Sequence, residues 1–385
     1  MKVLKDFLRA VMLVYKRILY KIACLTTKID SKTVFFESFQ GRNYSCSPKA
    51  IFEEMKESTE YKDYHFIWAF RDVEKNYSDK NDSIVRYETY AYYKALAKAK
   101  YWILNSNTRK FLKPREGQVY VQTWHGTPLK KIGLDVPGSD LNYGNEGKKF
   151  SYMISPSKYC SEKLVSAFGL EGREDIVLET GYPRNDALFD FDAEKVSRIK
   201  EELDIPSDKK VMLYAPTFRD NKHSQVSGYE NASGIDFVTL KEKLGDEYVV
   251  LFRAHYFVAS QMDFEQLDDF VIDVSDYEDV NDLYIVSDLL VTDYSSVFFD
   301  FANLKRPIIF YMYDYEDYKE NARDFYLDES DLPGPITKTQ ADLVDAIKKT
   351  SGWTPDAKYT DFNNKFNYLD GKLKGLEVAR RVFQD

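Results

Sequence analysis

The sequence contains little cysteine and shows no basic excess. Its three cysteines, Cys24, Cys46 and Cys160, are too few and too scattered for a disulfide framework or a structural zinc site, which favours a reducing, cytosolic setting. The 54 Lys and Arg residues are outnumbered by 63 Asp and Glu, for a net charge of −9. A general nucleic-acid binder needs an excess of basic side chains to neutralise phosphates. We therefore exclude nucleic acid as a partner.

The common short motifs of catalysis and cofactor binding are also missing. The chain has no Gly-x-Gly-x-x-Gly, P-loop, Gly-x-Ser-x-Gly or His-Glu-x-x-His motif, and no cluster with the spacing of metal ligands. These absences exclude the ordinary dinucleotide enzymes, P-loop kinases, α/β-hydrolases and zinc proteases. We expect neither a cofactor nor a metal ion.

No stretch is long and apolar enough to span a membrane, but residues 1–25 predict an amphipathic helix. Most of its basic side chains lie opposite the apolar face. Its longest uncharged run, Ala10 to Tyr15, is far shorter than the ~20 apolar residues of a membrane span. We interpret residues 1–30 as a helix lying on an anionic membrane, which would make the protein peripheral at the cytoplasmic face. The alternative is a helix whose apolar face packs on the protein's own core.

After this helix, short β-branched and aromatic runs alternate with helical patterns, as in open α/β sheets. Strands are expected at residues 33–36, 65–69, 102–104, 119–122, 152–154, 176–179, 211–214, 248–252, 271–274, 289–292 and 308–311. Ser157 is expected to cap a helix that Gly169 ends. A charge-rich stretch near residues 190–210 separates two series of elements. The pattern predicts two Rossmann-like α/β domains, at residues 31–190 and 191–385.

Ligands of such sheets bind at the carboxyl ends of the strands, so the loops after strands are the candidate sites. The loop after residues 119–122 carries His125, Gly126, Thr127 and Lys130. A neutral imidazole near pH 7 suits a general base, the glycine lets a ligand approach the backbone, and the lysine can meet phosphate. A histidine that satisfies a buried loop is the alternative interpretation.

Two loops in the second half carry cationic side chains after a strand. Arg253 and His255 alternate to the same side of an extended segment, which gives a donor pair suited to a diphosphate. Thr217 and Arg219 offer a hydroxyl and a guanidinium after residues 211–214. Turns with surface salt bridges would explain both loops without a ligand.

A third loop in that half combines a carboxylate with two hydroxyls. Asp293, Ser295 and Ser296 follow residues 289–292 and precede a predicted helix. The amino end of a helix can hold phosphate through its free N–H groups and its dipole. Capping of the helix alone would explain the serines. The aspartate could accept hydrogen bonds from ribose hydroxyls or orient a histidine.

Several runs in this order resemble the CDP-glycerol glycerophosphotransferase family, the polyol-phosphate transferases of teichoic acid and capsule synthesis. The runs are residues 123–133 (TWHGTPLKKIG), 155–157 (SPS), 180–186 (TGYPRND), 215–219 (APTFR), 253–255 (RAH), 292–296 (TDYSS), 305–307 (KRP) and 332–335 (LPGP). The resemblance implies a GT-B-like fold, with two Rossmann-type domains facing a cleft and the donor bound in the second. It also implies a peripheral membrane enzyme with a lipid-linked acceptor.

By the family pattern, His125 is the catalytic base, His255 contacts the donor phosphate, and Ser295 and Ser296 near Asp293 hold the diphosphate. The implied reaction transfers glycerol phosphate from CDP-glycerol to an acceptor hydroxyl and releases CMP. CDP-ribitol is the alternative donor, followed by a nucleotide-sugar. An inactive, membrane-bound scaffold of the synthesis complex is the alternative outside enzymes. The family's long polymerases often carry additional amino-terminal sequence that is not seen here. This difference favours a single-addition or capsular enzyme over a polymerase.

Overall fold

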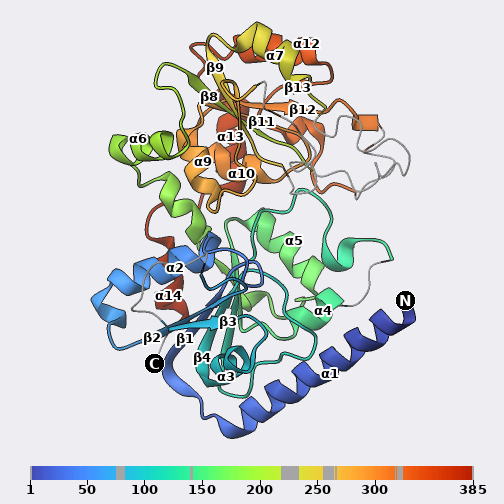
Figure 1. The fold of residues 1–385 in the computed structure, drawn as a ribbon, viewed down its shortest axis with the longest axis vertical. Helices are drawn as coiled ribbons and strands as arrows, with labels where there is room; N and C mark the ends of the chain where they lie inside the picture. Colours follow the sequence, from blue (N-terminus) through green and yellow to red (C-terminus); the bar gives the residue numbers. More distant parts are fainter. Residues whose placement is uncertain are drawn as a thin grey trace. The chain divides into compact units, whose positions relative to one another are not determined.

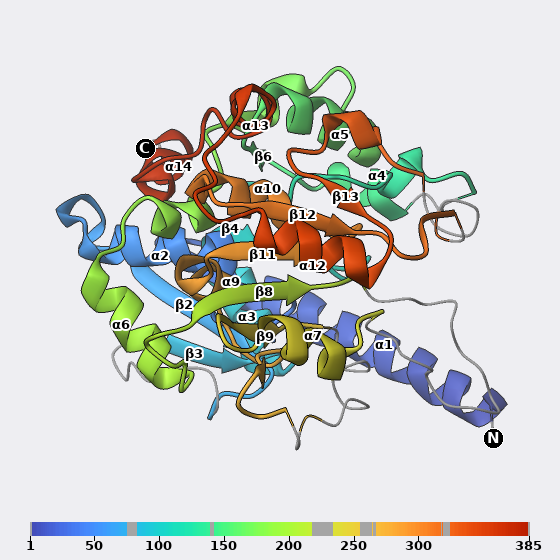
Figure 2. The ribbon, with the colours of Figure 1, turned by 90° about the horizontal axis from the view of Figure 1, so that it is seen from above.

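The computed structural model describes residues 2–74, 83–138, 142–217, 234–254, 264, 267–316, 318 and 324–383. The chain forms two compact α/β units. The first unit comprises Met1–His125, Gly133–Asp186 and Leu369–Asp385, and the second comprises Gly126–Ile132 and Ala187–Tyr368. Figures 1 and 2 show a sheet with flanking helices in each unit.

The first unit is built on a parallel sheet in the order β3-β2-β1-β4-β5-β6-β7. Its strands are β1 (Asp30–Glu37), β2 (His65–Phe70), β3 (Ser83–Arg86), β4 (Ala99–Leu104), β5 (Val119–Gln122), β6 (Tyr152–Ser155) and β7 (Val177–Glu179). Phe35 on β1 is in register with Trp102 on β4, and both are fully buried. Such apolar runs are typical of strands covered on both faces.

The helices of this unit are α1 (Lys2–Thr26), α2 (Cys46–Glu57), α3 (Tyr90–Lys98), α4 (Asn142–Gly147), α5 (Lys158–Phe168) and α14 (Lys374–Val382). The caps predicted for α5 are confirmed. The Ser157 side chain accepts a hydrogen bond from the Cys160 backbone N–H, and Gly169 adopts φ 63°. Glycine suits this left-handed end because it has no Cβ to clash with the backbone.

The second unit has a parallel sheet in the order β10-β9-β8-β11-β12-β13. Its strands are β8 (Lys210–Ala215), β9 (Tyr248–Phe252), β10 (Val271–Asp273), β11 (Leu289–Thr292), β12 (Ile308–Tyr311) and β13 (Ile336–Thr337). The α-helices among its described residues are α6 (Ala193–Glu202), α7 (Phe237–Leu244), α9 (Val280–Val286), α10 (Val297–Phe301), α12 (Gln340–Lys348) and α13 (Ala357–Phe366). The strand order reverses between β8 and β11, which defines a topological switch point.

The predicted fold class, two Rossmann-like α/β units, is confirmed, and every predicted strand is present. Two strands were missed. Strand β3 lies at a sheet edge with its side chains only partly buried, and β13 has two residues. Neither presents the run of apolar residues from which the other strands were predicted.

The observed division into units differs from the predicted boundary at residue 190. Residues 126–132 belong to the second unit, and residues 369–385 belong to the first. Two carboxylates hold the beginning of α14 there. Asp186 Oδ2 accepts hydrogen bonds from the backbone N–H groups of Lys374 and Gly375, and Glu54 Oε2 accepts one from Leu376. Carboxylates at a helix amino end satisfy N–H groups that have no partner within the helix.

Helix α1 contacts its unit through the face opposite its apolar side chains. Tyr20 and Ala23 are buried, and Lys16 Nζ forms an ion pair with Glu88 at 2.5 Å. The apolar side chains point to solvent: Phe7 is 63% exposed and Ile18 is 49% exposed. Packing of the apolar face on the protein's own core, the alternative interpretation of this helix, is therefore wrong. In Figures 1 and 2 the amino-terminal half of α1 extends beyond the rest of its unit. No helix of the described residues has the length and apolarity of a membrane span.

Candidate active site

The loop after β5 presents His125 with one ring nitrogen already engaged. The His125 Nδ1 atom lies 2.6 Å from the backbone carbonyl oxygen of Asn105, the residue after β4. A carbonyl oxygen only accepts hydrogen bonds, so Nδ1 carries the proton and Nε2 keeps its lone pair. The rings of Trp124 and Phe39 lie against the imidazole, with centroids 4.1 and 5.7 Å away. The loop therefore fixes both the orientation and the tautomer that a general base requires.

The protein around the imidazole also keeps it neutral. Burial lowers the pKa of His125 from 6.5 to about 4, the hydrogen bond to Asn105 opposes this shift, and the Arg184 guanidinium lowers the pKa further. The side chain nevertheless has exposed surface, and an exposed ring by itself would keep its ordinary pKa. Burial and the neighbouring Arg184 cation outweigh the hydrogen bond to Asn105, so the lowered pKa favours the neutral imidazole.

The residues that follow His125 lie in the second unit. Lys131 donates its backbone N–H to the Asp324 carbonyl oxygen at 2.8 Å, and its Nζ pairs with the Asp324 carboxylate at 2.9 Å. A Cβ atom built on Gly126 would lie 3.2 Å from Ser296 Oγ, a tight contact. Two loops that are separated by many residues, after β5 and after β11, are thus brought together in one unit.

Asp293 links the loops on the two sides of the topological switch point. Its side chain is buried, and its Oδ1 accepts hydrogen bonds from the backbone N–H groups of Thr217 at 2.8 Å and Tyr294 at 2.5 Å. Thr217 follows β8 and Tyr294 follows β11, so one carboxylate sets the backbone of both loops. Asp293 thus positions the loops of a candidate ligand site.

Ser295 and Ser296 are partly exposed at the amino end of α10. The Ser296 side chain forms no capping hydrogen bond. Helix capping therefore does not explain the Ser296 hydroxyl. Phosphate contact by these hydroxyls stays a prediction.

Arg253 is placed differently from the expectation. Its Nη1 donates to the backbone carbonyl oxygens of Val274 at 2.9 Å and Tyr277 at 2.8 Å, so this part of the guanidinium anchors the segment after β10. Alternation along a strand sets the side on which a residue lies but not the neighbours that a long side chain reaches, and donor contact by the rest of the guanidinium stays a prediction. These contacts favour a positioning role.

Four further predicted residues are Thr127, Lys130, His255 and Arg219. Thr127 is buried, and Lys130 Nζ lies 5.2 Å from the centroid of the Tyr318 ring. His255 and Arg219 lie outside the described residues, so their contacts with the donor stay predictions. Among the residues that the structure describes, no three His, Cys, Asp or Glu side chains could hold a metal ion together.

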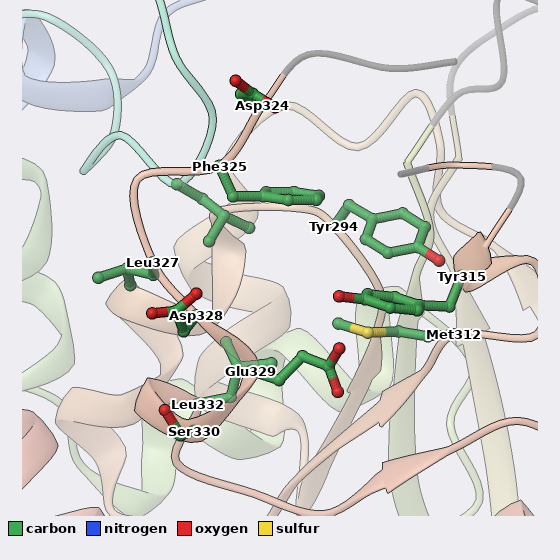
Figure 3. A pocket seen from close by; sticks show the side chains of 11 residues that line it. Tyr294, Met312, Tyr315, Asp324, Phe325, Leu327, Asp328, Glu329, Ser330 and Leu332 are labelled. Atoms are coloured by element: carbon green, nitrogen blue, oxygen red, sulfur yellow. The ribbon is translucent and has the colours of Figure 1, made fainter. Parts of the chain in front are cut away.

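Sequence reasoning missed Asn105 and a cavity of about 530 Å³ in the second unit. The cavity, drawn in Figure 3, lies beyond β12 and is lined mostly by Met312, Tyr315 and residues of the segment 324–332. A polar residue directly after β4 was a usable signal for Asn105, by the same strand-end rule that found His125. The cavity had no comparable signal, because its walls come from irregular segments.

Comparison with known proteins identifies the family of the chain. The sequence profile described as CDP-glycerol:poly(glycerophosphate) glycerophosphotransferase matches residues 18–384. The chain belongs to this family. It is 39% identical to the teichoic acid poly(glycerol phosphate) polymerase of Bacillus spizizenii strain W23, over 97% of this chain and 98% of that protein. It is 40% identical to the teichoic acid glycerol-phosphate transferase of Staphylococcus aureus, over 95% and 97% of the two chains.

Other relatives are longer than this chain. It spans about half of the Bacillus subtilis teichoic acid poly(glycerol phosphate) polymerase, to which it is 41% identical. A solved structure of the wall teichoic acid polymerase TagF, from a variant soaked with CDPG, matches with a TM-score of 0.89 and 37% identity, over 98% of this chain and 96% of that one. A UDP-GlcNAc 2-epimerase from Neisseria meningitidis shares the fold alone, with a TM-score of 0.52 and 11% identity.

Proposed function

We propose that this chain transfers glycerol phosphate from CDP-glycerol to a hydroxyl group of a lipid-linked teichoic acid or capsule acceptor. The acceptor oxygen forms a bond to the glycerol-bearing phosphorus while the bond from that phosphorus to the bridging oxygen breaks, and CMP leaves with that oxygen. The hydroxyl proton passes to a base. The transferred phosphorus is already tetrahedral and anionic, so catalysis consists mainly of positioning and charge stabilisation.

The observation that carries the proposal is the hydrogen bond from His125 Nδ1 to the Asn105 carbonyl. It leaves Nε2 as a proton acceptor in a loop whose next residue, Gly126, lies against Ser296. His125 directly precedes Gly126, and Gly126 lies against Ser296 of the loop that is proposed to hold the diphosphate. General bases of this kind contribute ~10²–10⁴-fold to a rate.

The donor is proposed to bind at the carboxyl ends of β8 and β11. Asp293 sets the loops after these strands, and Ser295 and Ser296 are the proposed diphosphate contacts, with Thr217, Lys130, Thr127 and Gly126 beside them. Arg253 supports this site by holding the segment after β10. His255 and Arg219 remain proposed donor contacts from the sequence pattern.

CDP-glycerol is favoured over CDP-ribitol by the pattern of identity among relatives. The relatives named for glycerol phosphate are 39–41% identical, whereas those named for ribitol phosphate are 31–36% identical. The base and anion contacts would serve either donor. An inactive scaffold would have no need to keep a histidine in a fixed tautomer.

We propose that α1 lies on an anionic membrane surface, and that the enzyme reaches the lipid-linked acceptor from this surface. Its outward apolar face can enter the boundary between headgroups and acyl chains, while the exposed Arg17 and Lys21, which flank that face, meet anionic headgroups. The protein would then act as a peripheral protein at the cytoplasmic face of the membrane.

A donor panel tests the proposal. The protein is incubated with a lipid-linked acceptor and CDP-glycerol, CDP-ribitol or a UDP-sugar, and CMP or UDP release is measured together with the mass of the product. We expect CMP release with CDP-glycerol and a product heavier by glycerol phosphate units. Release with CDP-ribitol alone would replace the donor, and release with none would favour the scaffold.

A further inference from the structure

The cavity beyond β12 has an apolar floor and a polar rim. Its buried lining includes Tyr294, Met312, Leu327 and Leu332, and its volume of about 530 Å³ lies within the ~300–1,000 Å³ range of small-molecule sites. Figure 3 shows Tyr294 and Phe325 on one side and Glu329 on the other. Aromatic faces of this kind can pack against the C–H groups of a ligand.

Carboxylates dominate the rim. Glu329 and Asp328 are exposed, and the Tyr315 hydroxyl donates a hydrogen bond to Glu329. A third carboxylate, on Asp324, is paired with Lys131 at 2.9 Å. An ionised carboxylate offers about four acceptor sites, so Glu329 can accept a ligand hydroxyl in addition to Tyr315.

The negative charge of the rim disfavours binding of the phosphate groups of the proposed substrates. A phosphate group beside Asp328 and Glu329 would meet like charge, which is unfavourable. A metal ion is not the occupant either, since no suitable group of ligands occurs among the residues that the structure describes. An uncharged group that donates hydrogen bonds and has an apolar edge fits both the carboxylates and the apolar lining. Hydroxyl-rich polyols and sugars have this chemistry.

The cavity adjoins the proposed reaction centre along the chain. Tyr294 immediately precedes Ser295 and Ser296, and Leu129 belongs to the same short segment as Gly126, which lies against Ser296. A group bound in the cavity therefore contacts the residue before the proposed diphosphate loop, Tyr294, and the segment that contains Gly126, through Leu129.

We propose that this cavity binds an uncharged, hydroxyl-rich unit of a substrate, a polyol or a sugar, and leaves the phosphates outside. The inference rests on the proposed function for the identity of the substrates. Two sources share this chemistry: the glycerol group of the donor and the hydroxyl-bearing end of the acceptor. Glu329 and Asp328 are the proposed hydroxyl acceptors, and Tyr294 and Phe325 the proposed packing surfaces.

The test compares Glu329→Gln with Glu316→Gln in the full chain. Both remove one carboxylate charge from an exposed side chain, but Glu316 does not line the cavity and is paired with Lys338 at 3.5 Å. At saturating donor, the KM for the acceptor is measured. At saturating acceptor, the KM for CDP-glycerol is measured. We expect Glu329→Gln to raise one of these KM values about tenfold with kcat within threefold, and Glu316→Gln to change neither.

A rise in the acceptor KM assigns the cavity to the acceptor, and a rise in the donor KM assigns it to the donor glycerol. Binding of glycerol and of N,N′-diacetylchitobiose, a neutral sugar, is followed separately by saturation-transfer NMR with the same two variants. A signal that Glu329→Gln weakens and Glu316→Gln retains supports the cavity even if no donor releases CMP, in which case only the proposed function fails. Equal KM values and equal NMR signals in both variants would overturn the proposal.

Discussion

The low pKa of His125 makes a sharp prediction about the pH dependence of catalysis. Only the neutral imidazole can accept the hydroxyl proton, so the rate falls when pH drops through its pKa. With the ordinary value of 6.5, about one tenth of the histidine would be neutral at pH 5.5; with a pKa of about 4, nearly all of it would be. Between pH 7.5 and 5.5 we therefore expect kcat/KM to change less than twofold, where an unperturbed histidine would lose about tenfold.

The assay is CMP release at limiting CDP-glycerol and saturating acceptor across pH 4.5–8, because kcat/KM for the donor then reports the ionisation of the enzyme with acceptor bound and donor absent. Circular dichroism at each pH separates loss of activity from loss of fold. Arg184→Gln removes the neighbouring cation and should shift the acidic limb toward higher pH. An acidic limb with its midpoint between 6 and 7 in the wild-type protein would refute the reasoning, since it would describe an imidazole that the surrounding protein leaves unperturbed.

Three other predictions follow from single contacts. Gly126→Val should raise the KM for CDP-glycerol at least tenfold, with Gly126→Ala intermediate, because a Cβ already lies 3.2 Å from Ser296 Oγ. Arg253→Met should lower the free energy of unfolding by about 1–3 kcal/mol in urea titrations, because two backbone carbonyls lose their donor; an unchanged midpoint with a raised KM would mean that the guanidinium serves the ligand instead. Phe7→Glu combined with Ile18→Glu should abolish cosedimentation with anionic vesicles and leave the helix content unchanged, since both side chains are exposed; unaltered cosedimentation would contradict the assignment of α1.

The elements that the sequence predicted well are those whose local signals agree with their surroundings. The ends of α5 follow from Ser157 and Gly169, and β5, β9 and β11 are buried apolar runs whose ends were predicted correctly. Edge strand β3 lacks such a run. The return of α14 to the first unit was also missed, because it depends on carboxylates of Asp186 and Glu54 that are distant in sequence.

The candidate site was predicted in part for a similar reason. The strand-end rule found His125 and Asp293, since parallel strands present their carboxyl ends at one edge. The rule could not place Arg253, whose side chain reaches backbone carbonyls beyond β10. It also could not show that Gly126 lies against Ser296, or that the segment beyond β12 encloses a cavity. Such contacts depend on how distant segments pack.

The role of His125 as the base is tested most directly by comparing His125→Ala with His65→Ala in CMP release from CDP-glycerol. His65 is exposed at the beginning of β2, away from the carboxyl ends of the strands, so its loss is a matched control. We predict that His125→Ala lowers kcat by about 10²–10⁴-fold while His65→Ala retains wild-type turnover. Turnover within a few-fold of wild type in folded His125→Ala would contradict the mechanism.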